Sequence, residues 1–207
     1  MFNAHLLRPG ENQLSIATNY KRGMSDQLQI GGNGLLALAG LLNGSLKHKL
    51  FDSPLGTTAT NIHLFFSSAL DAPTIGGFYG IIHTYPFSSS MDISGALYNF
   101  TAKSSEKFLA PNTLDMNLYS MSGAIDVYRG NLTYTGIIFL PLYSDLYQSD
   151  DTLEASLTQV ELFSSTPSIS PVFFGSVTIT SGSFNFEPGV LVSDLVSSLY
   201  LNLFWKW

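Results

Sequence analysis

The residues best suited to chemistry are four histidines, and their spacing does not fit a metal site or a catalytic pair. They are His5, His48, His63 and His83. None of them forms part of a His-Glu-x-x-His or His-x-His motif, which would place two imidazoles on one metal ion. His48 also lies between two lysines, which disfavour its charged form and its use as a ligand. We therefore expect structural roles for all four histidines.

Other reactive groups are equally isolated. Gly175-Ser176 and Gly182-Ser183 lack the Gly-x-Ser-x-Gly pattern of a nucleophile elbow. The one acidic cluster, over residues 145–154, does not match a calcium-binding EF-hand and is read as a solvated loop. Residues 31–34 are rich in glycine but lack the Lys-Ser/Thr of a phosphate loop. The chain has no cysteine, which excludes thiolate chemistry. We predict no catalytic, cofactor-binding or metal-binding residues, and no enzyme activity.

Charge is scarce and unevenly distributed. Charged residues make up 12% of the 207 residues, whereas hydrophobic residues reach 45%. This composition excludes a disordered chain and a coiled coil. Residues 1–49 carry a net positive charge, and residues 50–207 carry a net negative charge. Because an acidic body repels phosphate, we expect no nucleic-acid partner.

Short apolar alternations separated by turn residues indicate strands. The clearest strands cover residues 14–18, 62–66, 78–85, 93–101 and 156–163. Two hairpins are predicted, with turns at Gly130-Asn131 and Ser181-Gly182 between residues 124–135 and 176–186. Residues 35–42 form at most a short helix. The segment from Val192 fits one or two helical turns followed by a strand.

These elements predict an all-β fold, with little helix and extended terminal segments. We expect an antiparallel β-sandwich resembling a jelly roll. Residues 1–50 would form an N-terminal arm with the first strands, and residues 51–207 the sandwich body with a C-terminal aromatic strand. No linker composition separates the two parts, which favours one domain overall.

The C-terminus is unusually aromatic, because both tryptophans lie within its last three residues. Three interpretations stay open: a core strand, an anchor in a neighbouring subunit, and the terminal strand of an outer-membrane β-barrel. We predict that the second holds, and that the chain forms homo-oligomers through this segment. The predicted subunit-interface residues are Tyr200, Leu201, Leu203, Phe204, Trp205 and Trp207.

The function that these features favour is structural. Low charge, absent cysteine and hydroxyl-rich strands suggest a surface covered by copies of the chain. We therefore expect a virion structural protein of a phage-like virus: a capsid decoration, minor capsid, spike or tail component. It would assemble with itself and other virion proteins. No secretory signal is visible, so we expect synthesis in the host cytoplasm and residence in the virion, with no membrane partner. The alternatives are a carbohydrate- or receptor-binding module and an outer-membrane β-barrel.

Overall fold

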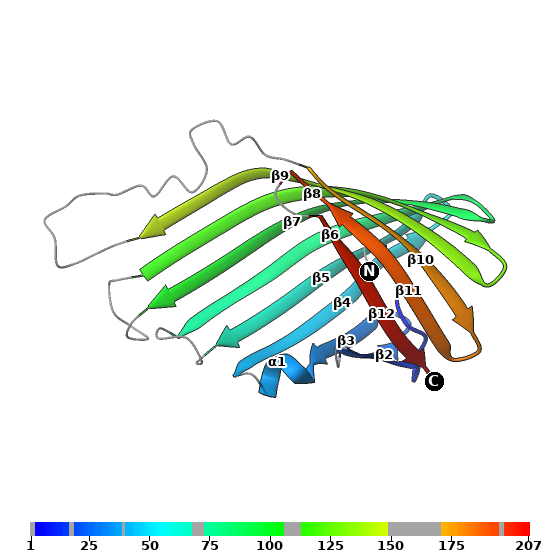
Figure 1. The fold of residues 1–207 in the computed structure, drawn as a ribbon, viewed down its shortest axis with the longest axis horizontal. Coiled ribbons are helices and arrows are strands. Elements are labelled where there is room, and N and C mark those ends of the chain that lie inside the picture. The colour runs from blue at the N-terminus through cyan, green and yellow to red at the C-terminus, as the bar shows by residue number, and fades with distance from the viewer. Residues whose placement is uncertain are drawn as a thin grey trace, which may run out of the picture.

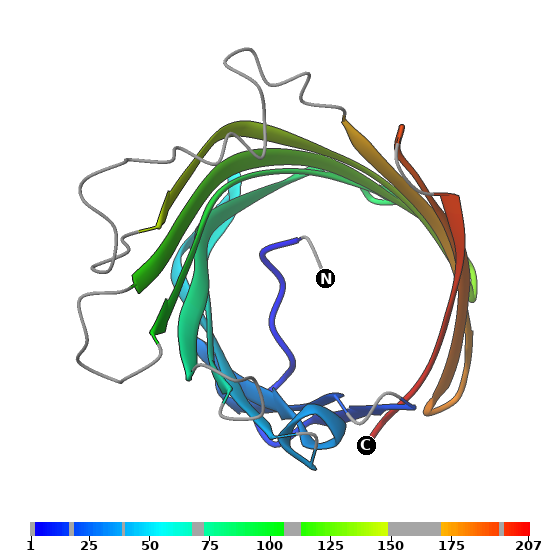
Figure 2. The ribbon, with the colours of Figure 1, turned by 60° about the vertical axis from the view of Figure 1, so that its left-hand side comes forward.

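The strands of the chain form one closed barrel. The computed structural model describes residues 3–16, 19–38, 40–67, 73–105, 113–148, 171–194 and 197–207. Within them, 12 antiparallel strands follow one another around the ring in sequence order, and β1 pairs with β12 to close it. Figure 1 shows the strands inclined to the long axis, and Figure 2 shows the ring that they enclose.

The strands lengthen toward the middle of the chain. The first four are β1 (Asn12–Ser15), β2 (Asn19–Ser25), β3 (Leu28–Asn33) and β4 (Leu41–Ser53). The next four are β5 (Gly56–Ser67), β6 (Thr74–Ser88), β7 (Met91–Ser105) and β8 (Thr113–Arg129). The last four are β9 (Leu132–Gln148), β10 (Val172–Ser181), β11 (Phe184–Val192) and β12 (Ser197–Lys206).

The predicted sandwich and jelly roll are wrong, because every strand pairs with its sequence neighbours. A jelly roll needs long connections that cross between two sheets. Here a two-residue turn joins β2 to β3, β4 to β5, β6 to β7, β8 to β9 and β10 to β11. A turn this short forces consecutive strands to pair, so the sheet grows as a meander and closes on itself. The boundary expected near residue 50 falls within β4, whose strand continues to Ser53.

Both predicted hairpins are confirmed. Val127 pairs with Tyr134 across the turn at Gly130, and Ser181 pairs with Phe184 across Gly182. Gly130 has φ 63° and Gly182 has φ 59°, the left-handed conformation that tight hairpins require and that glycine adopts without strain.

The helical predictions are corrected in detail. The helix expected over residues 35–42 is α1 (Gly34–Leu38), and β4 begins at Leu41. The C-terminal strand is confirmed as β12. The strand expected over residues 156–163 lies outside the described residues, as does most of the acidic cluster. Within the described ranges, no helix has the length and apolar character that crossing a membrane requires.

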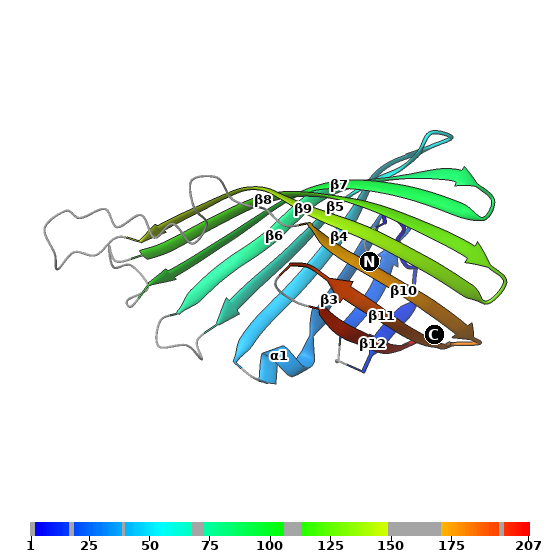
Figure 3. The same cartoon turned by 45° about the horizontal axis from the view of Figure 1, so that its top comes forward.

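The two ends of the barrel differ. All five two-residue turns lie at one end, together with the start of β1 and the C-terminus, and we call it the turn end. The connections at the opposite end, the loop end, include residues 34–40, 68–73, 106–112 and 149–171. Figure 3 shows the hairpins of the turn end together on one side of the barrel.

Candidate functional site

Large apolar side chains predominate on the outer surface of the barrel. Because side chains alternate along a strand, every second residue points outward. Large apolar residues fill these outward positions on strands all around the ring. They include Leu14, Met24, Leu46, Ile62, Leu64, Ile81, Leu97, Met121, Ile125, Phe173, Val190, Leu199 and Leu201. Leu97 is 62% exposed and Leu199 is 89% exposed, which is unusual for side chains of this kind.

Aromatic side chains gather toward both ends of this surface. Near the turn end, Phe184 contacts Trp205 with ring centroids 5.5 Å apart. Further outward aromatic residues near that end are Phe51, Tyr85, Phe87, Tyr134 and Trp207. Nearer the loop end, Tyr119 of β8 contacts Tyr143 of β9 at 6.1 Å. Outward aromatic rings thus gather near the turn end, and one tyrosine pair lies nearer the loop end.

The inward positions combine charged and polar side chains with apolar ones. A cavity of about 880 Å³ lies inside the ring. It is lined by residues near both ends of the chain and by residues of several strands between them. Its charged lining residues are Lys21, Asp126, Glu187 and Lys206. Lys21 and Lys206 both lie opposite Gln13 in the register, so the three inward side chains form one row across β2, β1 and β12. The barrel thus turns large apolar side chains outward and holds these charged side chains inside.

The N-terminal segment, Asn3–Arg8, lies inside the ring rather than along its wall, as Figure 2 shows. It reaches β1 through a reverse turn at Pro9-Gly10, in which Glu11 N donates to Arg8 O at 2.9 Å. Proline at the second and glycine at the third position suit a type II turn, and Gly10 has φ 80°. On β2, Gly23 has no side chain to obstruct the carbonyl oxygens of Leu7 and Arg8.

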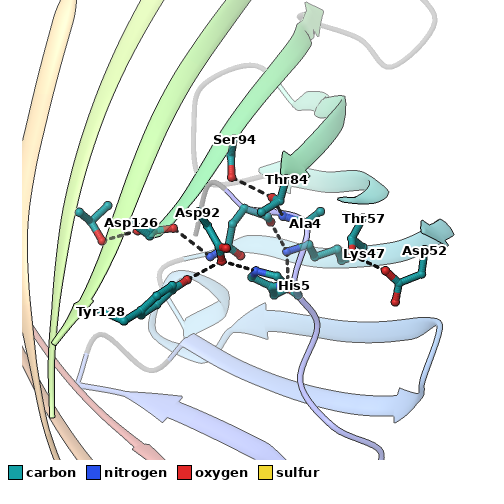
Figure 4. A network of polar contacts seen from close by, with 12 residues as sticks. Ala4, His5, Lys47, Asp52, Thr57, Thr84, Asp92, Ser94, Asp126 and Tyr128 are labelled. Carbon is teal, nitrogen blue, oxygen red and sulfur yellow. Dashed lines mark hydrogen bonds and ion pairs between the residues drawn. The ribbon is translucent and has the colours of Figure 1, made fainter. Parts of the chain in front are cut away.

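Lys47 of β4 holds the backbone of this segment. Its Nζ donates to the carbonyl oxygens of Asn3 and His5, both at 2.6 Å, and only 5% of the residue is exposed. On β6, the Thr84 hydroxyl accepts a bond from Ala4 N at 2.7 Å. Figure 4 shows these bonds converging on the segment from opposite sides. Because the Lys47 amine is buried, these carbonyl oxygens replace the water that would otherwise solvate it.

Two buried carboxylates on the neighbouring wall bind the side chains of the segment. His5 Nε2 and the Tyr128 hydroxyl both contact Asp92 Oδ2 at 2.8 Å. Asn3 Nδ2 donates to Asp126 at 3.2 Å, and the other oxygen of Asp126 accepts a bond from a threonine of β9. The lysine wall and the carboxylate wall therefore face each other across the segment (Figure 4).

Ala4 fills a small apolar pocket between these polar groups. The residue is fully buried against Ala59, Ile82, Ala96 and Tyr98, which come from β5, β6 and β7. A methyl group fits this space, and a larger side chain would need the wall to move. Leu7 N also donates to the side-chain oxygen of Gln29 at 2.9 Å. The wall thus contacts both the backbone and the side chains of the segment.

The histidines are divided between the two surfaces. His5 and His63 line the cavity, whereas His83 lies outward, where its ring bonds Thr58 Oγ1 at 2.8 Å. Across the part of the chain that the structure describes, no three potential ligands among His, Cys, Asp and Glu gather to hold a metal ion. The lumen can bind polar molecules and bury charge, but no nucleophile with its base is present among its described groups.

The predicted interface residues are separated by the pleat of β12. The outward members are Leu201, Leu203, Trp205 and Trp207, and the inward members are Tyr200 and Phe204. They pair with β11 and β1, so part of this segment closes the barrel. Contact of these residues with another subunit stays a prediction.

The N-terminal contacts were missed by the sequence analysis, although a signal for them exists. Asp126 lies between Ile125 and Val127 in a predicted strand, and an isolated charge at an inward position needs a partner. No family model matches the chain, and no curated protein matches it significantly.

Proposed function

We propose that the protein is an integral membrane β-barrel of the outer-membrane type, with a polar lumen. The observation that carries this proposal is the inverted pattern of the wall, with apolar side chains outward and charged side chains inward. Water-surrounded barrels place these groups the other way round. A closed barrel also satisfies every strand's backbone within the ring, which the hydrocarbon interior of a bilayer demands.

Two further features support this function. Aromatic residues border the apolar surface at both ends, where they can reach the interfaces of a bilayer. All connections at the turn end of the hairpins are two residues long, and the loop end has longer ones. Short turns on one side and longer loops on the other are typical of outer-membrane barrels. We favour this function over the expected virion role, because it explains the apolar exterior without a protein partner.

The two tryptophans provide the test. Trp205 and Trp207 are the only tryptophans of the chain. Trp205 lies on the outward face of β12, and Trp207 follows the last residue of that strand and is 59% exposed. The protein would be refolded into phospholipid vesicles that carry bromine at defined acyl-chain depths. We expect strong quenching of tryptophan emission by bromine placed near the interface. Bromine near the bilayer centre should quench less, because both residues lie at the turn end.

Vesicles of the same phospholipid without bromine provide the control. Bromine quenches only at contact range, so brominated and ordinary vesicles would give equal emission if both tryptophans stayed in the water outside the bilayer. A chain that stays in solution as a monodisperse assembly without lipid or detergent would contradict the proposal. That result would favour the virion role instead.

A further inference from the structure

We propose that the luminal wall around Lys47 is a binding site for an extended peptide, and that Asn3–Leu7 of this chain occupy it. The inference rests on the proposed function only in taking the lumen as a water-accessible space within the barrel. The contacts themselves define what the site recognises.

Recognition is directed first at the peptide backbone. Lys47 Nζ binds two carbonyl oxygens, and Thr84 Oγ1 and Gln29 Oε1 each accept a backbone N–H. These groups come from β4, β6 and β3, so they are fixed by the barrel and not by the segment. Thr84 is itself held by the hydroxyl of Ser94 at 2.8 Å. A wall that presents donors and acceptors to alternate backbone groups suits any chain in an extended conformation.

Selectivity arises at three consecutive side chains. The Asn3 position faces Asp126, and the His5 position faces Asp92. Between them, the Ala4 position is fully enclosed and admits only a small side chain. The favoured ligand is therefore a short peptide with a hydrogen-bond donor, a small residue and a basic or donor residue in succession.

The segment has the features of a ligand that is attached to its own receptor. It forms no strand with the wall, and it joins β1 through the turn at Pro9-Gly10, within which Arg8 O accepts the bond from Glu11 N. The barrel strands begin only at Asn12, so the ring does not need Asn3–Arg8 for its strand pairing. A separate peptide of the same sequence should therefore compete for the site.

The test uses a synthetic peptide of residues 3–8, with a blocked N-terminus and a fluorescent dye at its C-terminus. Its anisotropy would be measured with two refolded barrels in detergent micelles: the full chain and a chain lacking Asn3–Arg8. We expect the peptide to bind the deleted barrel and to bind the full chain at least about tenfold more weakly, because the full chain fills its own site. Equal binding to both barrels would overturn the proposal.

Two lysine variants of the deleted barrel locate the site. Lys47→Met should weaken peptide binding by about tenfold or more, since it removes bonds from a charged donor. Lys49→Met is the matched control: this lysine is two residues along β4 and contacts Asp52 at 3.3 Å. It should leave the affinity unchanged. Equal affinities for the two variants would contradict the assignment to Lys47.

A variant peptide tests the small pocket. Replacing Ala4 by Phe in the peptide should abolish binding to the deleted barrel, because the pocket of Ala59, Ile82 and Ala96 has no room for a ring. Unchanged binding would overturn the proposal. If the deleted barrel does not refold, the full chain with Ala4→Phe replaces it, since its own segment cannot enter the pocket. Bromine quenching of the same preparations reports insertion separately, so failure of this inference is distinguishable from failure of the proposed function.

Discussion

The exterior of β7 allows a quantitative test of the membrane proposal. Leu97 points outward near the middle of this strand, and its cross-strand neighbours are Ile81 and Met121. It is 62% exposed in the isolated barrel. In a bilayer, lipid covers this surface, whereas in an aqueous protein it faces water. Replacing Leu97 by Lys should therefore have opposite consequences in the two environments.

The expected magnitude follows from the exposed fraction. Complete burial of a leucine side chain is worth about 1.5–3 kcal/mol. Because Leu97 is 62% exposed, its contact with lipid contributes about 1–2 kcal/mol of this energy. The substitution removes that contribution. A lysine at mid-bilayer depth also loses hydration, and measured totals for such positions are about 2–4 kcal/mol. Leu97→Lys should lower the free energy of unfolding in vesicles by that amount.

The assay is urea unfolding in phospholipid vesicles, followed by tryptophan emission. The control is Leu55→Lys, because Leu55 is 73% exposed but lies in the two-residue turn between β4 and β5. A lysine near the interface costs only about 0–1 kcal/mol. Equal destabilisation by the two substitutions would refute the reasoning. So would a Leu97→Lys variant that folds equally well in vesicles and is more stable in water.

Three further substitutions test particular positions. Gly182→Ala should lower the free energy of unfolding in urea by about 1–2 kcal/mol, because a side chain at φ 59° clashes with the backbone. Gly23→Ala should speed hydrogen–deuterium exchange over residues 3–8, since the new methyl group overlaps the carbonyl oxygen of Arg8 and displaces the segment. Asn99→Leu should raise the free energy of unfolding in vesicles by about 1 kcal/mol, because its buried amide has no hydrogen-bond partner on the outward face.

Each of these has a comparison that would contradict it. Gly136→Ala is the control for Gly182→Ala, because Gly136 has open space around it. An equal fall in the free energy of unfolding for the two variants would reject the argument from the turn. Unchanged hydrogen–deuterium exchange over residues 3–8 would show that Gly23 does not limit the approach of the segment. A loss of stability in Asn99→Leu would mean that the amide is satisfied by groups outside the protein.

The local features of the fold were predictable, but its closure was not. The turns at Gly130 and Gly182 depend on residues within the turn, so the sequence analysis found both hairpins. Alternation along β12 was also visible. Closure depends on contacts such as Gln13 with Lys206, between residues at opposite ends of the chain. Strand alternation is the same in a sandwich and a barrel, so it could not distinguish them.

The candidate site was harder to predict, because the role of its residues depends on which face of the sheet lies inside the barrel. Lys47 lies between Leu46 and His48, and alternation places it on the opposite face from both. In a protein surrounded by water, that face would be the solvated one. Only the closed ring makes it the interior. The low overall charge, first taken to indicate subunit contact, is equally consistent with an exterior that meets lipid.

The seam between β1 and β12 has a consequence for folding. It consists of three residue pairs, Gln13 with Lys206, Leu14 with Trp205 and Ser15 with Phe204, whereas the middle strands pair along most of their length. Hairpins form quickly because their contacts are local, but this seam joins the two ends of the sequence. We therefore expect it to form last. Only the turn at Pro9-Gly10 and Glu11 separate Asn3–Arg8 from β1. The segment therefore has to be inside the curved sheet when the ring closes, or enter afterwards through an end. Assembly rate, and not only stability, is thus linked to these few residues.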